Sequence, residues 1–279
     1  MPNIAILGTG LLGSAFAEAA AARGDTVTAW NRTADKAQAL AKFGVKAAAS
    51  PAEAIRGASR VHLVLKDDAV VDEVIAAARP GLSPGAVLLD HTTTQPALTA
   101  ERARRLRSEG LDYLHCPVFM GPAAARQAQG SMMVAGPKAL FAQVEAELAK
   151  MTGRLEYLGE RPDLAAAHKL FGNAMIIGMV AIMADVLALA AASGVAAEDA
   201  IARLKSLDAN GMVARRGTAM AKGDFTASFE LTMARKDVGL MLDTIGAGPK
   251  AALPAIAARM DELIAAGHGA KDASALGLL

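Results

Sequence analysis

The first thirty residues of the chain follow the order strand, glycine-rich turn, helix, strand. An apolar strand is predicted over Asn3–Leu7, and the residues after it read Gly-Thr-Gly-Leu-Leu-Gly. Gly8 permits the tight turn out of the strand, and Gly10 lets the backbone approach a pyrophosphate at the helix N-terminus. Gly13 lets the helix pack closely on the strand. The spacing of the glycines within this order predicts a dinucleotide-binding site.

The segment after the second predicted strand indicates which dinucleotide is bound. Asn31 lies 18 residues after Gly13, near the ~20 expected for the residue that reads the ribose. Sites for NAD place Asp or Glu there, whereas this chain offers Arg32 and no carboxylate. Arg32 suits a 2′-phosphate, Asn31 and Thr33 can donate hydrogen bonds, and Lys36 adds charge. We therefore predict NADP; the simpler reading of Arg32 and Lys36 is a solvated helix start.

Composition narrows the class of protein. The 279 residues are enough for two domains. The 29 Lys and Arg balance the 28 Asp and Glu, which argues against a nucleic-acid-binding or polybasic membrane surface. Cys116 is the only cysteine, which excludes an intrachain disulfide, and a strand beginning by Asn3 leaves no room for a signal peptide. We predict a cytoplasmic protein and a structural role for Cys116.

Strand and helix signals alternate over the first half of the chain. Strands are predicted at Asn3–Leu7, Thr26–Trp30, Val61–Leu65, Val87–Asp90, Leu111–His115 and Ser131–Ala135, with a last edge strand at Arg154–Leu158. Ala-rich amphipathic segments separate them. This alternation is typical of a doubly wound parallel sheet, the Rossmann arrangement, which we predict over residues 1–161.

The second half is predicted to be helical. Pro162 suits the first turn of a helix, and a helical pattern runs on to Ser193, where Gly194 can end it. Further helices are predicted near Ala197–Leu207, Phe229–Ile245 and Leu253–Ala266, with no convincing strand. We predict an all-helical substrate and dimerisation domain over residues 162–279, beginning with a long interdomain helix.

Part of that long helix has the length and apolarity of a membrane span. The stretch Ala174–Ala192 contains one charge, Asp185. An Asp near the middle of a span would cost about 2.5–3.5 kcal/mol on insertion scales, and the helical pattern starts earlier and includes Lys169. A helix that is apolar on most sides is equally typical of a buried or dimer-interface helix. We predict no membrane insertion.

Lys169 and Asn173 are four residues apart on this helix and so share one face. A partly desolvated lysine has its pKa lowered from about 10.4 toward the operating range. Lys169 could then give a proton to a carbonyl oxygen, or take one from an alcohol, while Asn173 holds the substrate oxygen or orients the ammonium. The alternative is a snorkelling lysine at the start of a buried helix.

The loop from Cys116 to Pro122 is the predicted substrate loop. Ligands of open α/β sheets bind beyond the carboxyl ends of strands, which is where this loop begins. Gly121 would let backbone amides face a substrate, and Phe119 and Met120 would supply apolar walls. These two side chains could instead pack under the adjoining helices.

Other polar residues carry weaker signals. His91 follows a predicted strand but has no identifiable partner as a base, and the charged run Met233–Val238 is typical of a solvated helix face. The five histidines lack metal-ligand spacing. We predict no metal.

Together these motifs resemble the β-hydroxyacid dehydrogenase family, which includes 3-hydroxyisobutyrate dehydrogenases and glyoxylate/succinic semialdehyde reductases. The resemblance covers essentially the whole chain. The family's cofactor motif looks like residues 8–13, its Lys-x-x-x-Asn motif looks like Lys169 and Asn173, and its late Lys-Asp motif resembles Lys236-Asp237. It implies that Lys169 is the catalytic acid/base assisted by Asn173, and that the chain forms a homodimer or homotetramer through its helical domain.

The resemblance also implies roles for residues in the cofactor and substrate sites. Lys236 would lie beside the cofactor, and Thr93 and Leu65 would line the nicotinamide side. The predicted cofactor-binding residues are Gly8, Gly10, Leu11, Leu12, Gly13, Asn31, Arg32, Thr33, Lys36, Leu65, Lys66, Thr93 and Lys236. The predicted substrate-binding residues are Phe119, Met120, Gly121, Lys169 and Asn173.

One motif departs from the family. The substrate loop of the family, usually Ala-Pro-Val-Ser-Gly-Gly, is similar to residues 116–121 of this chain. In the family the Ser and the first Gly hold a substrate carboxylate, whereas this chain has Phe119 and Met120 at those positions. A bulkier or less polar carbonyl compound is therefore expected. Imine reductases share the fold and the Asn-Arg-Thr motif but usually place Asp or Tyr at the position of Lys169. A decarboxylating phosphogluconate-type enzyme is disfavoured, because such relatives have a much larger helical domain.

The sequence thus predicts an NADP-dependent reductase or dehydrogenase acting on an aldehyde, ketone or β-hydroxy acid, with Lys169 moving the proton. Imine reduction is the alternative activity. A redox sensor that binds NADP without turnover is the alternative from another class, although it would not need Lys169 and Asn173 on one helix face.

Overall fold

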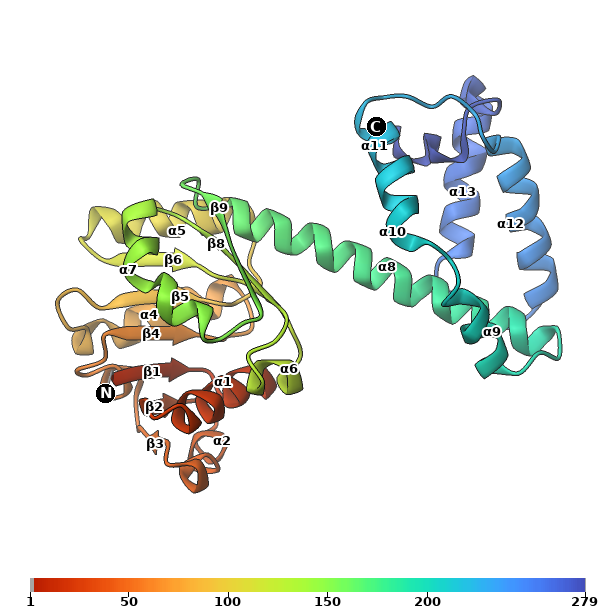
Figure 1. The fold of residues 1–279 in the computed structure, drawn as a ribbon. Helices are drawn as coiled ribbons and strands as arrows, with labels where there is room; N and C mark the ends of the chain where they lie inside the picture. The colour runs from red at the N-terminus through yellow and green to blue at the C-terminus, as the bar shows by residue number, and fades with distance from the viewer. Residues whose placement is uncertain (1–2, 279) are drawn as a thin grey trace. The chain divides into compact units, whose positions relative to one another are not determined.

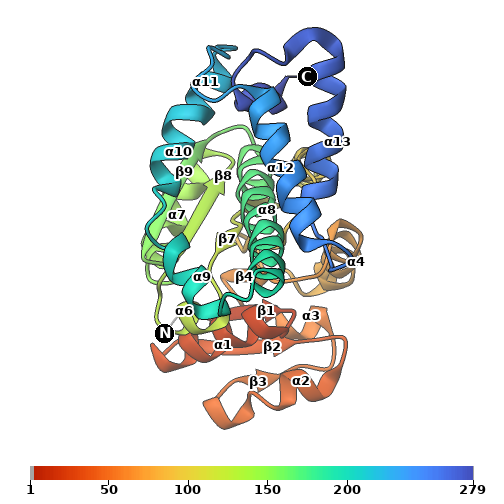
Figure 2. The same ribbon diagram turned by 90° about the vertical axis from the view of Figure 1, so that its right-hand side faces the viewer.

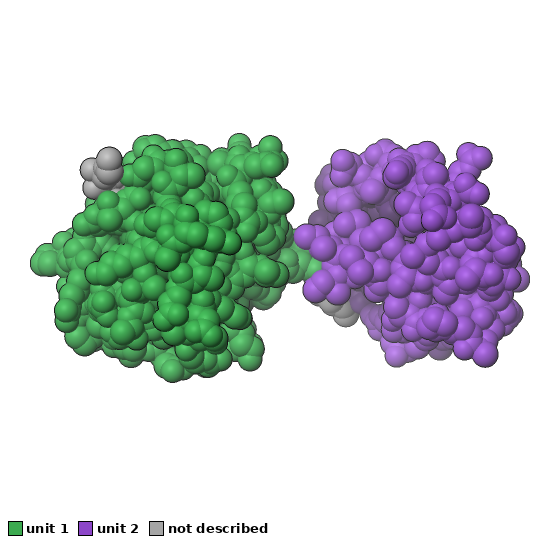
Figure 3. Space-filling view, turned by 90° about the horizontal axis from the view of Figure 1, so that it is seen from below, with its two compact units in different colours: residues 1–173 green, residues 174–279 purple. Residues whose placement is uncertain are grey.

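The computed structural model describes residues 3–278. They form two compact units that divide between Asn173 and Ala174 (Figure 3). The boundary falls inside one continuous helix, α8 (Leu164–Ala192). Each unit has a hydrophobic core of its own.

The first unit is built on a nine-stranded, mostly parallel sheet (Figure 1). The order is β3-β2-β1-β4-β5-β6-β8-β7, with β9 paired to β8. Strands β8 and β7 provide the antiparallel pairings. The bounds are β1 Asn3–Leu7, β2 Thr26–Trp30, β3 Lys46–Ala47, β4 Arg60–Leu63, β5 Val87–Asp90, β6 Asp112–His115, β7 Val118–Phe119, β8 Ser131–Ala135 and β9 Arg154–Gly159.

The predicted doubly wound sheet is confirmed, with differences in detail. All seven predicted strands are present within two residues of their predicted ends. The two-residue strands β3 and β7 were not predicted, because a segment of two residues carries no periodicity. The antiparallel direction of β8 also goes beyond the prediction, since hydrophobic pattern does not report strand direction.

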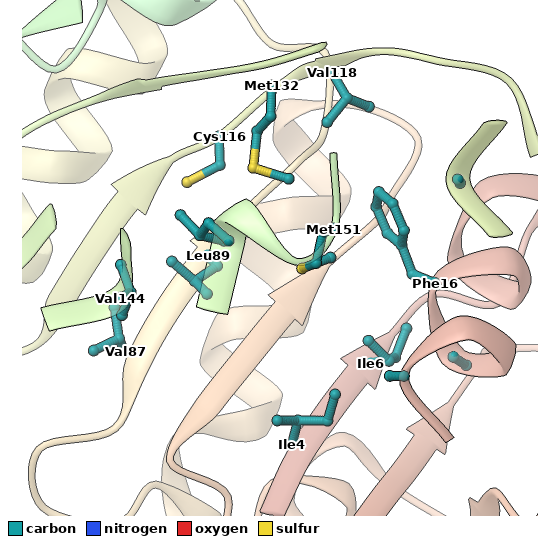
Figure 4. Close-up of a cluster of buried hydrophobic side chains, with 14 of the residues drawn as sticks. Ile4, Ile6, Phe16, Val87, Leu89, Cys116, Val118, Met132, Val144 and Met151 are labelled. Carbon is teal, nitrogen blue, oxygen red and sulfur yellow. The ribbon is translucent and has the colours of Figure 1, made fainter. Parts of the chain in front are cut away.

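Helices cover both faces of the sheet. They are α1 Leu11–Ala22, α2 Ala34–Gln38, α3 Pro51–Ala54, α4 Asp68–Ala78, α5 Pro96–Ser108, α6 Pro122–Arg126 and α7 Lys138–Ala149, with 3₁₀ turns at Ala41–Phe43 and Arg79–Gly81. On one face Phe16 of α1 and Val144 of α7 pack with Leu89 and Met132 of the sheet (Figure 4). On the other face, residues of α3, α4 and α5 form a second cluster. The central strands β1, β4 and β5 are mostly buried, and they are rich in Val, Ile and Leu because both faces of the sheet are covered there.

The order of the strands indicates where a ligand would bind on the sheet. Strand β1 pairs with β2 on one side and β4 on the other, so chain order reverses at β1. Ligands of open α/β sheets bind beyond the carboxyl ends of the strands at such a switch point. The glycine-rich turn after Leu7 lies there.

The helices of the second unit are joined by loops, and none of the named strands falls within its described residues, as predicted. Besides the C-terminal part of α8 it contains α9 Ala197–Leu204, α10 Ala209–Met212, α11 Thr218–Ala221, α12 Leu231–Ile245 and α13 Leu253–Leu263, with π-helical turns at Val213–Gly217 and Ile264–His268 and a 3₁₀ helix at Ala273–Gly277. Helices α12 and α13 lie side by side (Figures 1 and 2). Leu231 and Val238 of α12 pack with Met260 and Leu263 of α13.

Helix α8 matches the predicted long helix, and it ends as predicted. Gly194 follows it with φ +66°, the left-handed conformation that glycine adopts at helix C-termini. Among residues 3–278, α8 is the one helix long and apolar enough to cross a bilayer by length and composition. Asp185 is 2% exposed and accepts hydrogen bonds from the first backbone N–H groups of α13, at 2.8 Å from Leu253 N.

Candidate active site

The glycine-rich turn has the geometry that its sequence predicts. Gly8 has φ +100°, and a Cβ there would lie 2.2 Å from the carbonyl oxygen of Val64. A Cβ on Gly13 would lie 1.9 Å from the carbonyl oxygen of Gly8. A Cβ on Gly10 would meet nothing within 4 Å. Gly8 and Gly13 are therefore required by the turn itself, whereas Gly10 borders open space.

The groups around Gly10 fit the diphosphate of a dinucleotide. Gly10 is the N-cap of α1, with no side chain accepting from the first N–H groups and no acidic residue in the first turn. Those N–H groups, including those of Leu11 and Leu12, form an anion-binding helix N-terminus. The hydroxyl oxygen of Thr9 is buried and has no hydrogen-bond partner among the described residues. Leu11 is 83% exposed, which leaves an apolar surface beside the site.

The predicted 2′-phosphate residues line a cavity of about 320 Å³. Arg32 and Lys36 form no ion pair within residues 3–278, while Lys66 lies 3.6 Å from Asp67. The residues that line this cavity include three cations, Arg32, Lys36 and Lys66, and one carboxylate, that of Glu73. A second cavity of about 590 Å³ shares Gly10 and Lys36 with it. The first is lined by Gly8, Gly10, Trp30, Asn31, Arg32, Thr33, Lys36, Val64, Leu65, Lys66, Val70, Glu73 and Val74.

Hydrogen bonds join the ends of β4 and β5. The N–H of Leu65 donates to the Thr92 hydroxyl at 3.0 Å, and the Thr92 N–H donates to the Asp90 carboxylate at 3.0 Å. Thr93, which follows Thr92 in the chain, is exposed. Leu65 is held by its bond to Thr92, and the roles of Leu65 and Thr93 beside the nicotinamide stay predictions.

A buried pair of histidines supports this edge, and pattern reasoning missed it. His91 Nδ1 donates to the carbonyl of Cys116 at 2.7 Å, and its Nε2 lies 2.9 Å from Nδ1 of His62. Burial lowers the pKa of both rings, that of His91 to about 4. Cys116 is buried, and burial raises the pKa of its thiol. These groups are structural, and the partner that the sequence did not reveal for His91 is His62.

Lys169 lies against the substrate loop. Its ammonium donates to the carbonyl of Val118 at 2.8 Å and lies 4.0 Å from the centroid of the Phe119 ring. Its side chain is half-buried, and this burial lowers the pKa of the ammonium. Within the described residues no carboxylate pairs with it. A desolvated ammonium with two N–H groups left over can donate to a ligand oxygen.

Phe119 fits a gap that sequence reasoning did not identify. A Cβ on Gly172 would lie 2.2 Å from Cζ of Phe119, so the ring packs onto bare helix backbone three residues after Lys169. The signal was present as a glycine inside an otherwise continuous helix. Asn173, one turn after Lys169, forms no side-chain hydrogen bond within the described chain. Met120 is half-buried and Gly121 is exposed and caps α6.

Lys236 belongs to α12 in the second unit, where its Nζ lies 3.0 Å from Oδ1 of Asp237. Its prediction as a cofactor neighbour stays a prediction. No cluster of His, Cys, Asp or Glu in residues 3–278 could hold a metal.

Known proteins resemble this chain over its full length. Residues 3–159 match the NAD-binding domain of 6-phosphogluconate dehydrogenase, and residues 164–278 match the NAD-binding domain of NADP-dependent 3-hydroxyisobutyrate dehydrogenase. L-threonate dehydrogenase of Cupriavidus necator is 30% identical, over 98% of this chain and 94% of that protein. Glyoxylate/succinic semialdehyde reductase 1 of Arabidopsis thaliana is 27% identical, over 99% and 94%.

A solved structure shows the same fold. The imine reductase from Myxococcus stipitatus in complex with NADP⁺ superposes with a TM-score of 0.88, at 26% identity, over 99% of this chain and 98% of that one. The glycine-rich turn, the open N-terminus of α1 and the two matched domains lead to one assignment. The chain belongs to the β-hydroxyacid dehydrogenase family of NAD(P)-dependent oxidoreductases.

Proposed function

We propose that this protein reduces an aldehyde or ketone with NADPH, or oxidises a β-hydroxy acid in the reverse direction, with Lys169 as the general acid/base. When bound, the nicotinamide supplies or accepts the hydride at its C4. The observation that carries the proposal is the ammonium of Lys169, which is half-buried and held by the Val118 carbonyl at 2.8 Å. Within residues 3–278 no carboxylate pairs with it.

Lys169 supplies the proton that the reaction requires. As the carbonyl carbon gains a hydride, its oxygen becomes basic, and a nearby N–H donor gives up its proton to form the alcohol. One N–H of the ammonium is used by Val118, which fixes its direction and leaves two for the substrate oxygen. Burial lowers the pKa of this ammonium, which makes it a stronger acid. Solvent returns the proton after each turnover.

Phe119 and Met120 define the substrate class. An apolar ring against Lys169 in place of a serine hydroxyl offers no hydrogen bond to a carboxylate on the substrate. We therefore propose that, in the reductive direction, a neutral carbonyl compound with an apolar substituent is preferred over a compound that carries a carboxylate. Asn173, on the same helix face as Lys169, would hold the substrate oxygen.

Imine reduction is the second candidate, because an imine reductase shares the fold with a TM-score of 0.88. The charge at the site opposes it. An iminium substrate is a cation, and the unpaired ammonium of Lys169 would repel it in a desolvated site.

The test is NADPH oxidation with three matched groups of compounds: neutral aldehydes and ketones, semialdehydes that carry a carboxylate, and cyclic imines. We expect neutral carbonyl compounds to give the highest kcat/KM. We also expect Phe119→Ser to raise kcat/KM for the semialdehydes relative to neutral aldehydes. Turnover of imines alone would replace the proposal with imine reduction, and cofactor binding without turnover of any compound would favour a sensor.

The 2′-phosphate is proposed to bind Arg32. We expect Arg32→Ala to weaken NADPH binding by about 10–100-fold, because a charge-assisted hydrogen bond contributes roughly 1.5–3 kcal/mol, and to change NADH binding far less. Fluorescence titration with both cofactors measures this. Equal losses for NADPH and NADH would refute the contact.

We also propose that the chain forms a homodimer or homotetramer in the cytoplasm. In the second unit α8 exposes large apolar side chains, with Ile177 at 67% and Val180 at 57%. Patches of this kind mark interaction sites in soluble proteins. The carboxylate of Asp185, engaged inside the second unit, favours a second copy over lipid as the partner. Light scattering in solution would show a monomeric mass if this is wrong.

A further inference from the structure

Both polar atoms of the Asn31 side chain are hydrogen-bonded to the protein, which leaves one N–H group and one oxygen lone pair of the amide available. Its Oδ1 accepts a hydrogen bond from the N–H of Thr9 at 3.0 Å. Its Nδ2 donates to the carbonyl of Thr33 at 3.0 Å. The amide therefore joins the glycine-rich turn to the segment that carries Arg32.

The first of these bonds extends the pairing of β1 and β2. The last residues paired in register are Leu7 and Trp30, and the N–H of Gly8 donates to the Trp30 carbonyl at 2.8 Å. Beyond that point both chains turn away from strand geometry. The side chain of Asn31 then supplies the next link, to Thr9, where a backbone carbonyl would otherwise accept.

The second bond shapes the 2′-phosphate segment. The Thr33 carbonyl accepts from Asn31 Nδ2 and from the N–H of Lys36 at 3.2 Å. This holds the backbone on both sides of Arg32, whose side chain is exposed and forms no ion pair within the described residues. Arg32 is thus presented to the cavity from a fixed backbone.

We propose that Asn31 is a positioning residue that sets the distance between the pyrophosphate-binding turn and the 2′-phosphate-binding segment. It acts through Thr9 and Thr33 and is not the reader of the 2′-phosphate. An amide is required because one atom must accept from Thr9 and another must donate to Thr33. An aspartate would keep the first bond and place a carboxylate against the Thr33 carbonyl. The proposal rests on the dinucleotide site alone and is independent of the substrate.

The experiment compares dissociation constants of NADPH and NADH for Asn31→Ala and the matched variant Arg32→Ala. Trp30 is the only tryptophan and lines the cavity, so its fluorescence reports binding without any turnover. We expect Asn31→Ala to weaken both cofactors by a similar factor, about five- to thirtyfold for two lost hydrogen bonds. The pyrophosphate-binding turn serves both cofactors. Arg32→Ala should instead lower the preference for NADPH.

Two results for Asn31→Ala would overturn the proposal. A loss confined to NADPH in Asn31→Ala would make Asn31 a direct reader of the 2′-phosphate, and unchanged binding of both cofactors would remove any positioning role. Asn31→Asp covers the case in which the alanine variant does not fold, because it preserves shape and the bond to Thr9. We expect Asn31→Asp to weaken NADH, whereas tighter NADH binding would show a carboxylate that reads the ribose directly.

Discussion

Lys169→Met is expected to lower turnover of the best carbonyl substrate by about 10²–10⁴-fold, the range that positioned general acid catalysis contributes. Methionine keeps an unbranched apolar side chain beside Phe119 but removes the proton and the bond to Val118. Lys169 does not line either cavity beside the glycine-rich turn, so the NADPH dissociation constant should stay within about twofold of the wild type. Steady-state kinetics and Trp30 fluorescence measure the two effects separately.

The rates of reduction and oxidation should depend on pH in opposite directions. Reduction requires protonated Lys169, so its rate should fall as pH rises through the pKa of that group, while alcohol oxidation should rise. Burial lowers this pKa. The changes in the rates of reduction and of oxidation should therefore occur at a lower pH than that at which a solvated lysine titrates. Lys169→Arg is the matched control: it keeps a cation with several donors but cannot release a proton near neutral pH. A wild-type rate in either variant would contradict the assigned role.

The unfolding free energy is expected to fall by about 2 kcal/mol between pH 7.5 and pH 5 because of His91 alone. Its folded-state pKa is lowered to about 4 by burial, against about 6.5 in the unfolded chain. Between these values the unfolded state binds a proton that the folded state does not, so stability decreases as pH falls. At pH 7.5 the effect is nearly absent, because the imidazole is then neutral in both states. His62, whose pKa is lowered in the same way, adds to it.

Urea unfolding at the two pH values measures this loss, and His91→Gln is the control. The glutamine amide can still donate to the Cys116 carbonyl but does not titrate. Whatever its stability at pH 7.5, the variant should lose about 2 kcal/mol less than the wild type on going to pH 5. Carboxylates with lowered pKa, such as Asp185 and Asp272, lose their stabilisation mainly below this window. An unchanged pH dependence in His91→Gln would show that the buried ring does not govern it.

Much of the fold could be predicted because many of its elements are determined by residues that are close together in the sequence. Strand β1 and the turn from Gly8 to Gly13 lie within eleven residues, and every feature that they need is a property of those residues. The end of α8 at Gly194 is likewise local. By contrast, β7 is two residues long and α10 and α11 four each, too short for periodicity to reveal.

The candidate site was predictable in its residue types but not in its contacts. The sequence placed Lys169 and Phe119 in separate motifs, and only the fold brings the ammonium over the ring at 4.0 Å. The bond from Thr9 to Asn31 joins residues 22 positions apart, and the His62–His91 pair joins residues 29 apart. Distances of this kind depend on strand order and register, which pattern does not specify.

Hydride transfer from NADPH to a carbonyl carbon, with Lys169 supplying the proton, can be followed with an isotopic label. NADPH that carries deuterium at both C4 positions is mixed with the best neutral aldehyde, and the label is followed by mass spectrometry. We expect one deuterium on the carbinol carbon for each NADPH consumed, and almost no labelled product with Lys169→Met. NADPH binding without labelled alcohol, or label transferred only to imines, would contradict this expectation.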